Sequence, residues 1–237
     1  MIVSIMQPAF LPWLGYFNRL LLSERHVVLD HVQIDKSSKT NFANRNKIRT
    51  PTGWMWLTVP LVRKGQSGKL RLDQIQIAED ATWARKAWAS ITHNYRHAAH
   101  FDRYAPIFEP IFRSPGTHLH DLNQRLTQTL LAAFGIETEM LSSARLPVSG
   151  AKDALILEIC QAVGATRYIS GPFGRAYLDA ASFKAAGIEL LFHDYVHPQY
   201  RQAHPGFEPY MSALDLLFNH GPGSRSILSI RTELATS

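Results

Sequence analysis

The sequence predicts an α/β protein built on a mostly parallel sheet that helices cover. Three observations lead to this fold class. The chain opens with a short apolar run that a proline-containing turn ends, its second half alternates strand-like and helical segments, and 46% of its 237 residues are hydrophobic, which is enough for a substantial core. We therefore expect one α/β domain over residues 1–237.

The first strand, turn and helix are clearly marked. Residues 2–6 are apolar and strand-like, two prolines break residues 7–12, and residues 13–22 place apolar side chains at helical spacing. Residues 27–30 predict a second short strand that ends in a carboxylate. The polar, basic stretch 35–50 predicts a loop.

A small β addition is expected next. Residues 54–61 alternate large apolar side chains, residues 65–68 suit a turn, and residues 74–77 are a candidate partner strand. Together they predict a short antiparallel pair.

Helical spacing then dominates residues 82–134. Pro106 and Pro110 are expected to interrupt these helices, and Thr117 is expected to cap the helix that follows. We interpret residues 78–136 as a helical insertion or subdomain.

The second half returns to strand and helix alternation. Residues 137–141, 166–170 and 188–192 are strand-like, and residues 151–163 and 178–186 are helical. This alternation favours a Rossmann-like sheet, because parallel strands need crossover connections. Ligands of such sheets bind beyond the carboxyl ends of the strands. The loops concerned follow Met6, Asp30, Ser170 and Phe192.

One more helix is predicted near the end of the chain. Ser212 and Asp215 have the spacing of a capping box, with Asp in place of the usual Glu or Gln. Asn219 and Gly221 suit the end of that helix.

Charge and composition narrow the function class. The formal charge of +6, from 25 basic and 19 acidic side chains, suits anionic partners. The N-terminus lacks the features of a secretory signal and no later apolar run approaches the length of a membrane span, so we expect a cytoplasmic protein. Cys160 lies among apolar residues at helical spacing, which predicts a buried structural thiol.

Three segments carry groups that suit phosphate. The turn at residues 7–17 leads to a helix start, where unpaired N–H groups attract anions. Residues 44–49 combine three cations with two amides, and residues 170–175 combine a hydroxyl, glycine N–H groups and the guanidinium of Arg175. Each has a structural alternative: a tight turn closed by aromatic packing, a solvated surface, and a strand-to-helix turn without a ligand.

A cluster of titratable side chains follows the strand predicted at residues 188–192. An Asp-oriented histidine can act as a general base, so His197 is the candidate base and Asp194 its candidate orienter. His193 and His197 also have a spacing that suits metal ligands. Pro198 and the loop context weaken that interpretation, and no metal site is predicted.

Several motifs resemble those of the WbqC-like protein family, which is found with genes for bacterial O-antigen and other surface-polysaccharide synthesis. The opening motif is Gln7-Pro8-x-Phe10-Leu11-Pro12-Trp13-x-Gly15-Tyr16-Phe17. The later motifs are Asn44-Arg45-Asn46-x-Ile48, Trp56-Leu57-Thr58-Val59-Pro60, Tyr168-x-Ser170-Gly171-x-x-Gly174-Arg175-x-Tyr177-Leu178-Asp179, His197-Pro198-x-Tyr200-x-Gln202 and Ser212-x-x-Asp215-Leu216-Leu217-Phe218-Asn219-x-Gly221.

This resemblance implies an enzyme of O-antigen or lipopolysaccharide synthesis. We expect a transferase that modifies a nucleotide-linked sugar or other phosphorylated small molecule by acyl or aminoacyl transfer to an amine, with an acyl carrier or charged tRNA as donor. No cofactor is identified. Arg45, Lys47 and Arg175 would hold phosphate, and Trp13 and Tyr16 would offer stacking surface. The other expected substrate contacts are Gln7, Asn44, Asn46, Ser170, Gly171, Tyr177 and Tyr200.

Two other functions stay open. Nucleotidylyltransferases carry Gly-x-Phe-x-Pro-x-His-x-Gly-His after their first strand, and here Trp13 and Tyr16 stand where that motif has histidines, which argues against nucleotidyl transfer. A noncatalytic protein that binds RNA or an assembly partner is supported by the net charge, although aromatics interleaved for base stacking are not evident in the sequence.

Overall fold

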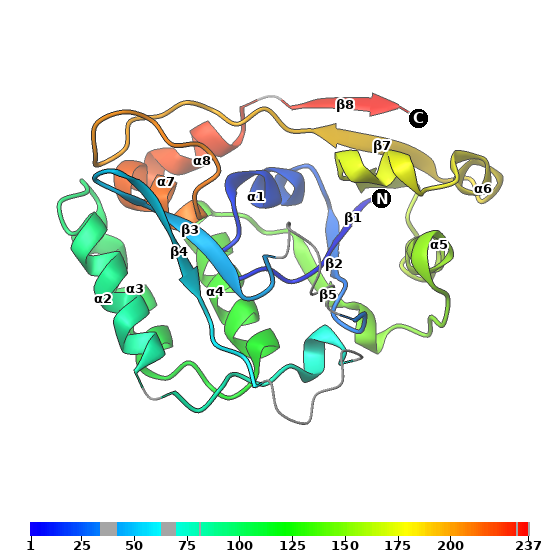
Figure 1. The fold of residues 1–237 in the computed structure, drawn as a ribbon. Helices are drawn as coiled ribbons and strands as arrows, with labels where there is room; N and C mark the ends of the chain where they lie inside the picture. Colours follow the sequence, from blue (N-terminus) through cyan, green and yellow to red (C-terminus); the bar gives the residue numbers. More distant parts are fainter. Residues whose placement is uncertain (34–41, 63–69, 81, 231, 237) are drawn as a thin grey trace.

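The computed structural model describes residues 1–33, 42–62, 70–80, 82–230 and 232–236. Within them, six strands form one sheet in the order β5-β2-β1-β6-β7-β8 (Figure 1). All neighbours are parallel except β7 and β8. The strands are β1 (Ile2–Met6), β2 (Arg25–Val28), β5 (Glu139–Ser142), β6 (Arg167–Ser170), β7 (Glu189–Asp194) and β8 (Glu233–Thr236). Numbered along the chain, this is the 3-2-1-4-5-6 order of a Rossmann sheet, so the predicted fold class is confirmed.

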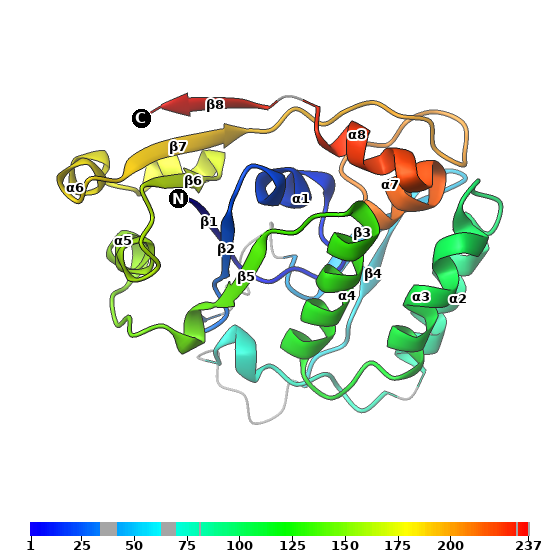
Figure 2. The same cartoon turned by 180° about the vertical axis from the view of Figure 1, so that it is seen from behind.

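Helices cover both faces of this sheet, as the two opposite views show (Figures 1 and 2). The apolar face packs against α5 and α6 through one buried cluster. The other face contacts α1 through His26 of β2 and His193 of β7, and Ser4 of β1 bonds to His26. The helices are α1 (Leu14–Leu21), α2 (Trp83–Tyr95), α3 (Phe101–Arg113), α4 (Leu119–Phe134), α5 (Lys152–Ala162), α6 (Ala180–Ala185), α7 (Ala213–His220) and α8 (Ser224–Leu228), with short 3-10 turns at Leu72–Gln74, Ser143–Arg145, Pro172–Ala176 and Gly221–Gly223.

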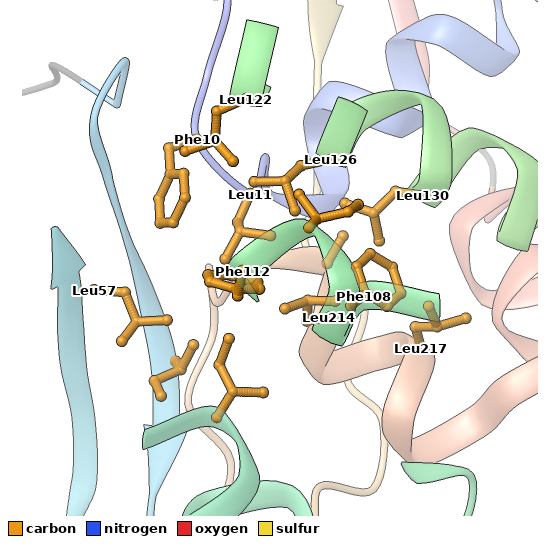
Figure 3. Close-up of a cluster of buried hydrophobic side chains, with 14 of the residues drawn as sticks. Phe10, Leu11, Leu57, Phe108, Phe112, Leu122, Leu126, Leu130, Leu214 and Leu217 are labelled. Carbon is orange, nitrogen blue, oxygen red and sulfur yellow. The ribbon is translucent and has the colours of Figure 1, made fainter. Parts of the chain in front are cut away.

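The larger core lies between the helices that follow β4 (Gly53–Thr58) and the turn that follows β1. Its members come from α1, α2, α3, α4, α7, α8, β3 (Arg45–Thr50), β4 and that turn, and Figure 3 shows the part made by α3, α4, α7, β4 and the turn. Figure 3 labels Phe10, Leu11, Leu57, Phe108, Phe112, Leu122, Leu126, Leu130, Leu214 and Leu217. The predicted helical insertion therefore shares its core with the first loop of the sheet. That residues 1–237 form a single domain stays a prediction, which this shared core supports.

The predicted interruption of the helices by proline is wrong. Helix α3 runs through both Pro106 and Pro110. A proline inside a helix costs about 3 kcal/mol, through a lost hydrogen bond and a steric clash. Burial of Phe108 and Phe112 in the shared core offsets that cost. Tertiary packing therefore overrides the local signal.

The predicted strand pairing is also wrong. Strand β4 (Gly53–Thr58) pairs antiparallel with β3 (Arg45–Thr50), in a segment that the sequence predicts as loop. Of the expected pairing with residues 74–77, only an isolated bridge between Leu61 and Ile77 is present. Residues 35–41 and the predicted turn at 65–68 lie outside the described residues.

The polar composition of β3 explains this error. Its buried side chains include the polar Asn46 and Arg49 beside Ile48, so the hydrophobic period of two is hidden. Both polar side chains have hydrogen-bond partners, which makes their burial acceptable.

Of the predicted helix ends, the cap at Ser212 and the end at Gly221 are confirmed, whereas the roles of Thr117 and Asp215 are wrong. Ser212 caps α7, and its hydroxyl accepts a bond from the N–H of Leu214 at 3.3 Å. Thr117 does not cap α4, because its hydroxyl contacts the ring of the next residue. Asp215 closes no capping box, since its carboxylate accepts a bond from the Tyr200 hydroxyl instead.

Candidate functional site

The carboxyl edge of the sheet is where a ligand of this fold is expected. Strand order reverses between β1 and β6, and the loops that follow these two strands diverge there. Gln7 opens the first loop and is exposed, and Gly171 opens the second and is half-buried. The structure therefore places two predicted substrate contacts at the switch point of the sheet.

A cavity of about 340 Å³ opens at this edge, beyond β1, β2 and β5 and against α4. Pro8 of the first loop and Tyr16 of α1 form part of its wall. Polar side chains dominate the remainder, among them Asp30, His120, Asn123, Gln124, Ser142 and Arg145. Convergent polar groups in a concave site at the carboxyl edge are typical of a ligand site.

Asp30 and His120 are the two residues of this cavity that are placed for proton transfer. The Asp30 carboxylate is 1% exposed and accepts bonds from the Ser142 hydroxyl at 2.6 Å, the Ser143 hydroxyl at 3.0 Å and the Ala144 N–H at 3.0 Å. Its Oδ2 lies 3.8 Å from Nε2 of His120. Nδ1 of His120 is buried and has no hydrogen-bond partner among the described residues. An imidazole beside a fixed carboxylate suits a general base.

Sequence reasoning missed this pair. Asp30 carries a weak signal, because it follows a strand at the correct edge of the sheet. His120 carries none, since it lies 90 positions further along the chain, in the first turn of α4. Only the packing of α4 against the end of β2 brings the two together.

The expected pairing of His197 with Asp194 is not formed. Both oxygens of Asp194 accept bonds from Arg175, at 2.8 and 2.7 Å, and this guanidinium holds the pKa of Asp194 below its ordinary value. Nδ1 of His197 lies 2.8 Å from the carbonyl oxygen of Pro198, and burial lowers the pKa of its ring. Arg175, the expected phosphate contact, is therefore occupied by a carboxylate.

The turn after β1 is part of the core. Phe10 and Leu11 are 0% exposed, and Nδ2 of Asn46 donates to the Leu11 carbonyl at 2.6 Å. The start of α1 is covered as well, because a Cβ at Gly15 would lie 2.7 Å from the ring of Tyr195. This packing favours the tight-turn interpretation of the segment.

Asn46 is expected to stabilise this turn rather than to contact substrate. Replacing Asn46 with Ala leaves the buried carbonyl of Leu11 without its donor, so we expect the free energy of unfolding to fall by about 1–3 kcal/mol. The matched control is Asn44→Ala, which removes a partly exposed bond to Val59. Urea denaturation of both variants measures the difference, and equal small losses would contradict the assignment.

Cations and aromatic rings interleave on the β3–β4 hairpin. Cζ of Arg45 lies 4.7 Å from the centroid of the Trp56 ring, and Nζ of Lys47 lies 3.8 Å from that of Trp54. Trp54 is 42% exposed. We call these four side chains the hairpin surface. This interleaving is not evident in the sequence, because the pairing of the two strands creates it.

Comparison with known proteins now decides the family. Residues 7–227 match the model of the WbqC-like protein family. The chain belongs to the WbqC-like protein family. The uncharacterized protein Rv1507c of Mycobacterium tuberculosis (strain ATCC 25618 / H37Rv) is 35% identical over 222 residues, which cover 92% of this chain and 94% of that protein. No solved structure matches.

The described part of this WbqC-like protein holds neither a candidate membrane span nor a candidate metal centre. None of its described helices is long and apolar enough to cross a bilayer. Among the described residues, no three His, Cys, Asp or Glu side chains are grouped to hold a metal ion.

Some motif residues of this WbqC-like protein form a buried structural network. The Tyr200 hydroxyl and the Gln202 amide donate to Asp215 at 2.7 and 2.8 Å, and Arg49 donates to Gln202 at 3.2 Å. Burial raises the pKa of Asp215. Tyr200, an expected substrate contact, therefore ties the loop after β7 to α7.

The remaining expected contacts divide between core and surface. Trp13 is half-buried and packs edge-on against Tyr16. Tyr16 is 1% exposed, and its hydroxyl oxygen lies 3.3 Å from Nε2 of His26. Ser170 is 2% exposed, whereas Tyr177, which follows the 3-10 turn at Pro172–Ala176, is 51% exposed. Tyr16 can contact a ligand only from the wall of the cavity.

Proposed function

We propose that this protein is a transferase of surface-polysaccharide synthesis, which moves an acyl or aminoacyl group to an amine on a nucleotide-linked sugar or related phosphorylated metabolite. The observation that carries the proposal is the cavity at the carboxyl edge, where a fixed carboxylate lies beside a histidine. Family membership and the Rossmann strand order support the substrate class. An acyl carrier or a charged tRNA would supply the group.

His120 takes the role of general base in this scheme. The amine nitrogen attacks the carbonyl carbon of the donor, and Nε2 of neutral His120 accepts the proton that the amine loses. The imidazolium is stabilised by Asp30 at 3.8 Å. The new amide bond forms as the bond to the donor's thiol or ribose oxygen breaks, and His120 returns the proton to that leaving atom. Asn123 and Gln124 offer amides that orient the substrate.

A ligand screen followed by a transfer assay tests the proposal. Nucleotide-linked amino sugars are expected to raise the melting temperature by mass action, and plain nucleosides are not. The best sugar, incubated with acylated carrier protein or with charged tRNA, should gain the mass of one acyl or aminoacyl group. Release of pyrophosphate from nucleoside triphosphate and sugar phosphate would instead favour a nucleotidylyltransferase. Absence of both products and of any thermal shift would contradict the proposal.

Binding of RNA without catalysis is the second candidate, and the hairpin surface favours it. Aromatic rings beside cations suit single-stranded RNA, because a base that stacks on such a ring gains about 1–3 kcal/mol. We expect Trp54→Ala and Lys47→Gln each to weaken binding of an unstructured RNA about 5- to 50-fold. The salt dependence should also decrease for Lys47→Gln.

The matched control for this measurement is Lys184→Gln, which removes an exposed cation on α6. Fluorescence anisotropy at two salt concentrations gives the affinities. Equal affinity for all four proteins would exclude the hairpin surface as an RNA site. If a charged tRNA binds through the hairpin surface and donates its aminoacyl group, RNA binding would be part of the transferase function.

A further inference from the structure

Arg19, in the last turn of α1, is a buried cation with no carboxylate partner among the described residues. Arg19 is 9% exposed. Burial lowers the pKa of Arg19, and the nearby hydroxyls of Tyr16, Tyr168 and Tyr177 oppose this shift. A buried charge is costly unless an opposite charge or several hydrogen bonds compensate it. The protein's described side chains supply only part of that compensation.

A chain of hydrogen bonds fixes the orientation of this guanidinium. Nε of Arg19 donates to Nδ1 of His193 at 3.4 Å, Nε2 of His193 donates to Oδ1 of Asn18 at 2.7 Å, and Nδ2 of Asn18 donates to the Leu228 carbonyl at 2.6 Å. Burial and the charge of Arg19 lower the pKa of His193 to about 3, so the ring is neutral and can accept at Nδ1. This arrangement uses Nε and leaves Nη1 and Nη2 without a hydrogen-bond partner among the described residues.

Those two nitrogens lie at the switch point of the sheet. A Cβ at Gly171, the first residue after β6, would lie 2.8 Å from Nη2 and 3.3 Å from Nη1. Gly171 is half-buried, and Tyr177, which interacts electrostatically with Arg19, is 51% exposed. The absence of a side chain at Gly171 therefore allows the guanidinium to reach the carboxyl edge, where ligands of this strand order bind.

We propose that Arg19 is the anion-binding residue of the switch point and takes a phosphate or pyrophosphate group through Nη1 and Nη2. The planar fork of a guanidinium matches two phosphate oxygens, and an anion there supplies the missing opposite charge. Assigning this group to the nucleotide-linked substrate rests on the proposed function. The anion site itself rests only on the geometry of Arg19 and Gly171.

Calorimetric titration with inorganic pyrophosphate tests the site directly. We expect Arg19→Gln to weaken pyrophosphate about 10- to 100-fold, Arg19→Lys to recover part of the loss, and Gly171→Ala to weaken it because the new methyl group crowds Nη2. The matched control is Arg167→Gln, which removes an exposed, ion-paired arginine at the opposite end of β6. Wild-type affinity in Arg19→Gln, or no binding by the wild type, would overturn the proposal.

Pyrophosphate binding and acyl transfer are measured separately, so failure of the anion site can be distinguished from failure of the proposed function. Loss of pyrophosphate affinity in Arg19→Gln, in a protein that shows no acyl transfer, would reject the function and keep the site. Acyl transfer with an unchanged KM in Arg19→Gln would reject the site and keep the function. If Arg19→Gln does not fold, Gly171→Ala decides, since it keeps the buried charge. Unchanged affinity in that variant would count against the site.

Discussion

Replacing His120 with Gln is expected to lower the kcat of the proposed transfer by about 10²- to 10⁴-fold, with little change in KM. Glutamine keeps much of the volume and polarity of the ring but cannot accept the proton that the amine loses. The substrate still binds, because His120 acts mainly in the transition state. Steady-state kinetics with the best acceptor found in the ligand screen would measure both parameters.

The matched control is His118→Gln, two residues earlier, at the N-cap of α4. Its ring contacts the Thr117 hydroxyl and does not belong to the wall of the cavity, so we expect kcat to stay within about twofold of the wild type. Asp30→Asn should lower kcat as His120→Gln does, because the imidazolium loses its opposite charge. Full activity in His120→Gln would show that another group removes the proton.

The second large effect is a loss of stability in mild acid. His26 and His193 are 0% and 1% exposed, and burial together with the charge of Arg19 lowers the pKa of each to about 3. Both rings titrate near 6.5 in an unfolded chain. Below that pH the unfolded state binds protons that the folded state does not, so the unfolded state is favoured. At pH 5 the loss is about 2 kcal/mol for each histidine, or about 4 kcal/mol in all.

Urea denaturation at pH 7, 6 and 5 measures this loss. We expect His26→Gln to lower stability at pH 7, because Ser4 and Tyr16 lose their partner, and to make the pH dependence about half as steep. His97→Gln, an exposed histidine, should leave the slope unchanged. A free energy of unfolding that is constant from pH 7 to pH 5 would show that both rings can be protonated without unfolding.

The order of strands and helices in the second half was predictable from local pattern. Residues 151–163 and 166–170 were predicted as a helix and a strand, and the structure has α5 and β6 there. Strand β8 (Glu233–Thr236) was not predicted, because its sequence Glu-Leu-Ala-Thr contains no β-branched apolar or aromatic residue that would mark a strand. The hairpin of β3 and β4 was missed since polar residues such as Asn46 occupy its buried positions.

The location of the candidate site could also be predicted from the sequence, whereas the roles of its residues could not. The carboxyl edge, and within it Gly171, could be located from strand ends and from family motifs. The individual roles could not: Arg175 is paired with Asp194, Tyr200 with Asp215, and His197 contacts a carbonyl. A motif shows which residues occur together in the sequence. It does not show whether a motif residue contacts a ligand or another residue of the protein.

The sequence by itself determined the fold class, the family and the edge of the sheet at which a ligand is expected, because each follows from short-range patterns. Tertiary structure alone decided the pairing of Asp30 with His120 and the approach of Arg19 to Gly171. Both contacts join segments that are distant along the chain, and their geometry depends on how α4 and α1 pack against the sheet. No local spacing encodes that packing.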